Sequence, residues 1–183
     1  MEDNIICPLC LSNPAYKKGY SLWNYDNQYI KHLIYMIKFQ NRPEVVKILF
    51  QFKDHIKSLD IFNNADYLIF VPMHRDDIRK RGYNQAVIIA KTLSKITGIK
   101  IRYDMLFKIE HTKAQVDLNM NQRIKNLTGA FRAHKIENVK KVVIVDDVFT
   151  TGSTINECAK VLNRQGIESN FFTLAATPSN LGA

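Results

Sequence analysis

The hydrophobic and polar positions of this chain follow two periods, one typical of β-strands and one typical of helices. Apolar or alternating segments predict four strands, at residues 20–25, 67–71, 142–145 and 170–176. Apolar residues at helical spacing predict helices that begin near Tyr29 and near Pro43, and two more at residues 76–97 and 155–162. Strands separated by helices of this length favour right-handed crossovers. The pattern therefore predicts an α/β fold, a parallel sheet flanked by helices, with ligands at the carboxyl ends of the strands.

The length of 183 residues suits one domain with a small N-terminal appendage. We expect a short lead at residues 1–18, an accessory or hood segment at residues 19–60, and the sheet-forming core at residues 61–183. No apolar run approaches the roughly 20 residues of a membrane span, and the first residues do not resemble a signal peptide. Three cysteines do not make a disulfide framework, so we expect a cytoplasmic protein with no membrane association.

Positive charge is unevenly distributed along the chain. The 26 Lys and Arg residues exceed the 17 Asp and Glu residues and give a net charge of +9. Nearly all of the excess falls within residues 61–135, which indicates phosphate-bearing partners for that segment. The partner could be a small metabolite or a nucleic acid, and a merely soluble basic surface is the alternative interpretation.

The segment at residues 142–154 carries the strongest chemical signal. Its apolar strand is expected to end at two adjacent carboxylates, Asp146 and Asp147, with one or both at the turn. A glycine and several hydroxyls follow where a helix should start, at Thr150, Thr151, Gly152, Ser153 and Thr154. Such a helix N-terminus can bind a phosphate, while carboxylates accept hydrogen bonds from hydroxyl groups. The combination predicts a site for a ribose 5-phosphate.

A simpler interpretation of the same segment is a helix that Ser153 or Thr154 caps, with no ligand. Other phosphate motifs are absent from the sequence, because it contains neither Gly-x-Gly nor Gly-Lys-Ser/Thr.

The segment at residues 142–154 resembles the phosphoribosyl pyrophosphate (PRPP) signature of type I phosphoribosyltransferases. Three further pairs of motifs are similar to the ComF-like branch of that superfamily, which is linked to natural competence. They lie at residues 25–26 with 37–39, 71–75 with 81–86, and 112–115 with 123–126. The resemblance implies a type I phosphoribosyltransferase-like fold that binds PRPP with Mg²⁺ and transfers its phosphoribosyl group.

The resemblance also implies roles for particular residues. Asp146 and Asp147 would hold the ribose hydroxyls and favour the positive charge that develops at the anomeric carbon, and residues 150–154 would bind the 5-phosphate. The pyrophosphate would be contacted by basic and neighbouring residues: Met73, His74, Arg75, Arg81, Lys38 and Lys113. The polar stretch at residues 108–128 would be a flap that closes over PRPP. A surface helix at residues 115–127 is the alternative for that stretch.

Cys7 and Cys10 have the spacing of half a zinc site, and ComF-like proteins commonly carry a four-cysteine zinc module. Because the only other cysteine, Cys158, falls on the apolar face of a predicted helix, it is expected in the core. The pair either binds Zn²⁺ with ligands from elsewhere or is the remnant of such a module.

The acceptor of the phosphoribosyl group is not identified by any motif. The alternative function is a non-catalytic competence protein that binds single-stranded DNA and uses the PRPP site as a sensor or scaffold. Proteins of the competence machinery are further expected partners.

Overall fold

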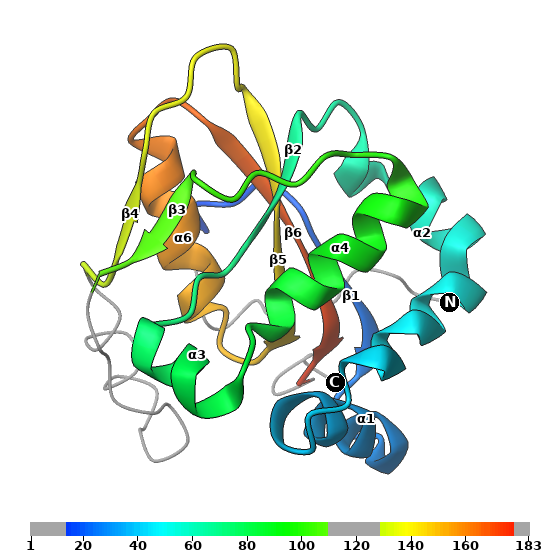
Figure 1. The fold of residues 1–183 in the computed structure, drawn as a ribbon. Helices are drawn as coiled ribbons and strands as arrows, with labels where there is room; N and C mark the ends of the chain where they lie inside the picture. Colours follow the sequence, from blue (N-terminus) through cyan, green and yellow to red (C-terminus); the bar gives the residue numbers. More distant parts are fainter. Residues whose placement is uncertain (1–13, 110–128, 178–183) are drawn as a thin grey trace.

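The computed structural model describes residues 14–109 and 129–177, and its centre is a four-stranded parallel sheet (Figure 1). The strands are β1 (Gly19–Asn24), β2 (Tyr67–Phe70), β5 (Lys141–Phe149) and β6 (Glu168–Ala176), in the spatial order β1-β6-β5-β2. All three neighbouring pairs are parallel, as the alternation of strands and helices predicts. No helix in the described ranges is long and apolar enough to cross a membrane.

The strand β5 lies between β6 and β2 and explains the apolar run at its start. Ile144 is paired with Ile69 of β2 and with Phe171 of β6, and all three side chains are buried. A central parallel strand is covered on both faces, so its residues are apolar without alternation.

Each face of the sheet carries its own hydrophobic cluster, and Figure 1 shows the elements that pack on the sheet. One face is covered by α4 (Gln85–Thr97) together with α1 (Gln28–Phe39), the 3-10 helix η1 (Pro43–Phe52) and α2 (Lys53–Ser58). The short 3-10 turn η2 (Asp60–Phe62) also packs on this face. The other face is covered by α6 (Ser153–Asn163) and by a two-stranded antiparallel ribbon of β3 (Leu106–Lys108) and β4 (Phe131–Ala133).

The single helix expected at residues 76–97 is wrong, because the structure divides it into α3 (Arg75–Arg81) and α4. Gly82 ends α3 in the left-handed conformation, with φ +89°, which glycine adopts without steric cost. The side chain of Asn84 then caps α4 by accepting the backbone N–H of Ala86 at 2.9 Å. The end of α4 at Gly98 agrees with the prediction, since Gly98 is also left-handed.

The helix expected to begin near Pro43 does start there, but its first ten residues form the 3-10 helix η1 rather than an α-helix. Its inward-facing residues Val46, Leu49 and Phe52 are spaced by three, which matches the three residues per turn of a 3-10 helix.

The boundaries expected from the sequence do not separate independent units. The strand β1, placed in the accessory segment, is part of the main sheet and pairs with β6. Tyr16, placed in the lead, is 3% exposed and packs edge-to-face on Phe171, with their ring centroids 4.8 Å apart. Residues 14–60 and 61–177 therefore share the same core where the structure describes them.

Candidate phosphate and ribose site at the carboxyl edge of the sheet

The two carboxylates lie inside β5 and not at its end. Asp146 is paired with Thr173 of β6, and the pairing continues to Phe149 opposite Ala176. The expectation that the strand stops at the carboxylates is therefore wrong, because the backbone pairing with β6 holds three more residues in the strand. The carboxylates are consequently held on a rigid element of the sheet, with the turn to α6 following them.

The turn between β5 and α6 depends on Gly152. Its φ is +72°, and a Cβ atom there would lie 2.6 Å from Cζ of Phe149. Phe149 itself is buried and stacks on Phe171 with ring centroids 4.8 Å apart. Glycine is therefore required both by the backbone conformation and by the close approach of the ring.

The N-cap residue of α6 is a glycine, which has no side chain. The helix begins at Ser153 and its N-cap position is Gly152, so neither Ser153 nor Thr154 is the N-cap residue that the simpler interpretation expects. The backbone N–H of Ser153 donates to Oγ1 of Thr151 at 3.4 Å. The hydroxyls of Thr151 and Ser153 bond to each other at 2.8 Å beside the start of the helix, and the first N–H groups of a helix lack partners within it.

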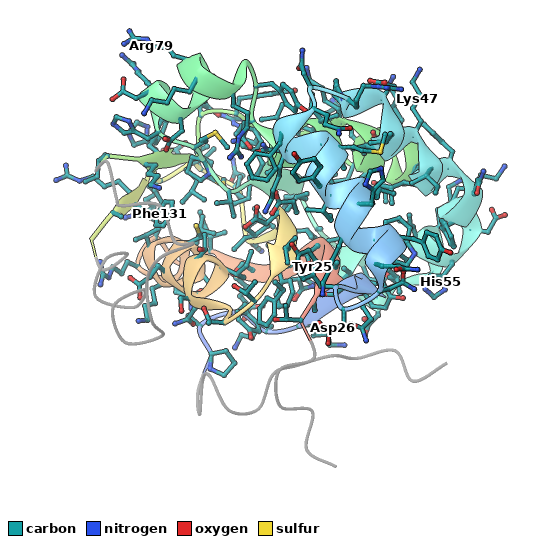
Figure 2. All side chains as sticks on the ribbon, turned by 90° about the horizontal axis from the view of Figure 1, so that it is seen from below. Tyr25, Asp26, Lys47, His55, Arg79 and Phe131 are labelled. Carbon is teal, nitrogen blue, oxygen red and sulfur yellow. The ribbon has the colours of Figure 1, made fainter. Side chains whose placement is uncertain are left out.

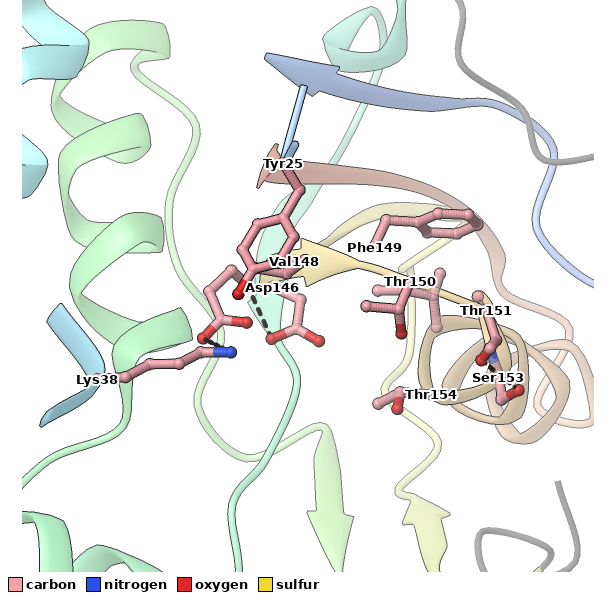
Figure 3. A pocket seen from close by; sticks show the side chains of 12 residues that line it. Tyr25, Lys38, Asp146, Val148, Phe149, Thr150, Thr151, Ser153 and Thr154 are labelled. Carbon is pink, nitrogen blue, oxygen red and sulfur yellow. Dashed lines mark hydrogen bonds and ion pairs between the residues drawn. The ribbon is translucent and has the colours of Figure 1, made fainter. Parts of the chain in front are cut away.

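These features line one pocket of about 340 Å³ (Figure 3). Figure 3 shows Thr150, Thr151 and Ser153 on one side and Lys38 on the other, with Asp146 between them. The lining residues come from β5, the following turn, the start of α6, and α1 with the residue after β1; they are Tyr25, Lys38 and residues 146–155. The structure therefore brings together all of the residues expected to bind ribose and 5-phosphate.

The carboxylate pair makes the pocket electrostatically unusual. Burial and the neighbouring charge of Asp147 raise the pKa of Asp146 to about 7, against a weaker opposing effect of the backbone N–H of Asp147 and of Lys38. That N–H donates to Oδ1 of Asp146 at 2.9 Å. Nζ of Lys38 lies 3.2 Å from Oδ2 of Asp147. Burial disfavours the charge of Lys38, but attraction to Asp147 and Asp146 outweighs it, and the pKa of Lys38 is raised.

Among the described residues expected at the pyrophosphate, Lys38 alone lines this pocket. Met73, His74 and Arg75 are not among the lining residues, and the side chain of His74 caps α3 by accepting the N–H of Asp76. Arg81 borders a neighbouring recess of about 470 Å³ that it shares with Lys38.

The remaining cysteine and flap expectations are divided between the core and the undescribed part of the chain. Near Arg75 on α3, Arg79 points outward at the rim of the molecule in Figure 2, and its side chain is 80% exposed. Lys113 and the stretch at residues 110–128 lie outside the described residues, as do Cys7 and Cys10. Cys158 is buried in the core as expected, and burial raises the pKa of its thiol.

Two residues near the site were not expected there. Tyr25, which the sequence analysis included only in the motif at residues 25–26, lines the pocket. Lys108 at the end of β3 is half-buried, and burial lowers its pKa against the attraction of Asp77, Cys158 and Asp146. A lysine inside a short apolar strand was the only available hint of this second positive charge near the carboxylates.

Comparison with known proteins agrees with this geometry. The model of the phosphoribosyl transferase domain matches residues 78–180. Since this is more than half of the chain, the protein belongs to the phosphoribosyltransferase domain family, and its relatives place it in the ComF-like branch.

Two relatives support the placement in that branch. "Competence protein F" of Haemophilus influenzae is 31% identical over 170 residues, which are 88% of this chain and 74% of the relative. "DNA utilization protein YhgH" of Escherichia coli K12 is 28% identical over 170 residues, which are 90% of this chain and 74% of the relative. Among solved structures, adenine phosphoribosyltransferase from Leishmania donovani aligns with a TM-score of 0.46 at 10% identity, over 86% of this chain and 83% of that one.

Proposed function

We propose that this protein binds PRPP together with Mg²⁺ and transfers its phosphoribosyl group to an acceptor, in a role linked to competence and DNA uptake. One observation carries the proposal: a single pocket joins the carboxylates of Asp146 and Asp147 to a helix N-terminus that has glycine at its N-cap position and two adjacent hydroxyls. The names of the relatives, "Competence protein F" and "DNA utilization protein YhgH", support the biological part of the proposal.

The two halves of the pocket suit the two parts of a ribose 5-phosphate. The N-terminus of α6 carries a partial positive charge, and with the hydroxyls of Thr151 and Ser153 it offers donors to the phosphate. The carboxylates of Asp146 and Asp147 would accept hydrogen bonds from the ribose hydroxyls, which fixes the sugar relative to its phosphate.

The same carboxylates would act on the reaction itself. Loss of pyrophosphate leaves positive charge on the ribose ring, and negative charge held nearby in a partly buried site stabilises that transition state. For this role Asp146 has to be ionised. With a pKa of about 7 for Asp146, we expect transfer to accelerate as the pH rises through neutrality.

The Mg²⁺ is assigned to the ligand and not to a site of its own. In the part of the chain that the structure describes, no group of three or more His, Cys, Asp or Glu residues is placed to hold an ion. A Mg²⁺ bound to the diphosphate oxygens of PRPP keeps several of its waters and needs few protein ligands. It would neutralise the charge of the leaving pyrophosphate.

Thermal unfolding with and without ligand tests the proposal. PRPP with Mg²⁺ should bind the native state and raise its stability by about 2.7 kcal/mol at a hundredfold excess over Kd. Ribose 5-phosphate should compete for the same pocket. Asp147→Asn should weaken both ligands while circular dichroism stays unchanged, and Lys91→Gln on α4, outside the pocket, is the matched control. Calorimetry of folded wild-type protein that detects no binding at millimolar PRPP would refute the proposal.

A second candidate function, binding of single-stranded DNA, is favoured by an aromatic and basic surface beside the pocket. On α1, Tyr35 is 49% exposed and Phe39 is 63% exposed, and their ring centroids are 5.2 Å apart. The guanidinium of Arg81 lies 5.5 Å from the centroid of Phe39, and Lys80 borders the same recess. Exposed rings stack on bases and neighbouring cations bind phosphates, so this surface suits a single strand without sequence preference.

Salt dependence and a pair of matched variants test this second function. Affinity for an oligothymidine should fall with salt, with a slope of about −0.7 for each phosphate contacted. Phe39→Ala should weaken binding about ten- to a hundredfold by removing a stacking partner. Tyr29→Ala is the control, because Tyr29 is 75% exposed on the same helix but does not border the recess. Equal loss in both variants, or binding that does not respond to salt, contradicts the assignment.

A further inference from the structure

Lys38 reaches the carboxylate pair from the last turn of α1. Its neighbour Ile37 and the residue one turn earlier, Ile34, are buried against the sheet and fix the helix there. Nζ of Lys38 lies 3.2 Å from Oδ2 of Asp147, and the two side chains are 26% and 11% exposed. The contact is thus a largely buried ion pair between a helix and a strand that are more than a hundred residues apart in the chain.

The two carboxylates are held in different ways. The carboxylate of Asp146 accepts the backbone N–H of Asp147 at 2.9 Å, so the strand itself orients it. The carboxylate of Asp147 is held by its ion pair with Lys38. The direction of the Asp147 carboxylate therefore depends on the position of α1.

This geometry is hard to reconcile with a direct contact between Lys38 and the pyrophosphate. If Nζ of Lys38 turned to the diphosphate, Asp147 would remain beside Asp146 without its cation, and an unpaired carboxylate at 11% exposure is costly. The uncompensated repulsion between the two carboxylates would add to that cost. An ammonium already bound to a carboxylate serves better as a fixed support than as a mobile ligand.

We propose that Lys38 is a positioning residue, which holds the carboxylate of Asp147 in the orientation that receives the ribose hydroxyls and does not contact the pyrophosphate. This inference rests on the proposed function, because it concerns the same PRPP site. It also makes α1 part of the ribose site, since displacing α1 would release Asp147.

Three ligands separate this role from the alternatives. Wild-type protein, Lys38→Met, Lys38→Arg and Lys31→Met are compared by calorimetry and NMR titration with PRPP and Mg²⁺, ribose 5-phosphate, and inorganic phosphate. Lys31 is the matched control, because it lies two turns earlier on α1 and contacts Asp26 at 4.0 Å and the ring of Tyr25 at 5.9 Å from its centroid, but neither carboxylate of the pair. Circular dichroism and melting temperature establish that each variant is folded.

The expected result is that Lys38→Met weakens PRPP and ribose 5-phosphate by the same factor, about ten- to a hundredfold, and leaves inorganic phosphate unchanged. Lys38→Arg should recover most of the loss, and Lys31→Met should show none. A loss confined to PRPP would mean that Lys38 contacts the pyrophosphate, and an equal loss for all three ligands would mean a general effect of charge or of α1. Either result overturns the inference. Failure of the wild type to bind PRPP would instead count against the proposed function.

Discussion

The two sides of the pocket are built in different ways. The side that includes the turn at residues 149–153 is local: its left-handed glycine, its hydroxyl pair and the stacked ring of Phe149 lie within a few residues of one another. The opposite side consists of Tyr25, which follows β1 and donates its backbone N–H to the carbonyl of Ala176 of β6, and Lys38, which reaches the pocket because the face of α1 is buried against the sheet. The local side suits the constant part of a ligand, the 5-phosphate. The opposite side depends on contacts between elements that are distant in the chain.

The largest effect is expected from breaking the local side at Gly152. Gly152→Ala forces an L-residue to φ +72° and drives its Cβ toward Phe149. We expect a loss of about 3 kcal/mol in stability and a melting temperature lower by about 6–12 °C, together with loss of ribose 5-phosphate binding. Gly98→Ala is the control, because its φ is +80° and no atom lies within 4 Å of the added Cβ. Equal melting temperatures for the two variants would show that the approach of Phe149 has no energetic consequence.

The adjacent carboxylates should respond to substitution with opposite signs. The native pKa of Asp146 of about 7 exceeds the unfolded value of about 3.9, so the folded state loses stability as the pH rises between these values. Asp146→Asn should therefore raise the free energy of unfolding by about 1–3 kcal/mol at pH 8 and leave it unchanged near pH 4. Asp147→Asn removes the partner of Lys38 and should lower stability at pH 8.

Urea unfolding at the two pH values measures both carboxylate variants. Lys38→Met gives a further check, because loss of its positive charge should move the pKa of Asp146 upward and increase the pH dependence of stability. A free energy of unfolding of the wild type that does not change between pH 4 and pH 8 would count against a pKa of about 7 for Asp146.

A smaller effect, on binding alone, is expected at Thr151. Thr151→Val removes the hydroxyl that bonds to Ser153 at 2.8 Å at the start of α6. Ribose 5-phosphate should bind more weakly by about 1–3 kcal/mol, with the fold intact. Thr97→Val at the end of α4 removes a hydroxyl bonded to the carbonyl of Leu93, away from the pocket, and should leave calorimetric affinity unchanged. A loss of the same size in both variants would place the effect in general stability.

The smallest effect is expected from the cysteine pair. Cys7→Ser combined with Cys10→Ser should leave most of the helical circular dichroism intact, because the lead segment is short and the hydrophobic clusters of the described residues are built by the main sheet and the elements that cover its two faces. A chelator should likewise leave the core folded. Complete unfolding of the wild type by a chelator would show that the metal contributes to folding of the whole chain.

Much of the fold and half of the site follow from the sequence alone. The four strands of the main sheet and the helix after β5 were predictable because their hydrophobic periods are local, and the phosphate turn was predictable because its residues are contiguous. The short strands β3 and β4 were not predicted. The break between α3 and α4 was missed although Gly82 and Asn84 carry it, because the apolar positions that predicted the helix all lie in α4 and do not indicate where that helix begins. The length of β5 was missed because polar residues do not reveal that a strand stays paired with its neighbour.

The sequence by itself determined the order of strands and helices, the buried character of β5, and the run of carboxylates and hydroxyls that defines the phosphate turn. Only the tertiary structure decided that β1 joins the main sheet, that Tyr25 and Lys38 line the pocket, and that Lys38 pairs with Asp147 at 3.2 Å. The physical reason is separation along the chain. Backbone conformation and hydrophobic period act over a few residues, whereas the meeting of α1 with β5 depends on how two distant amphipathic elements bury their apolar faces on the same sheet.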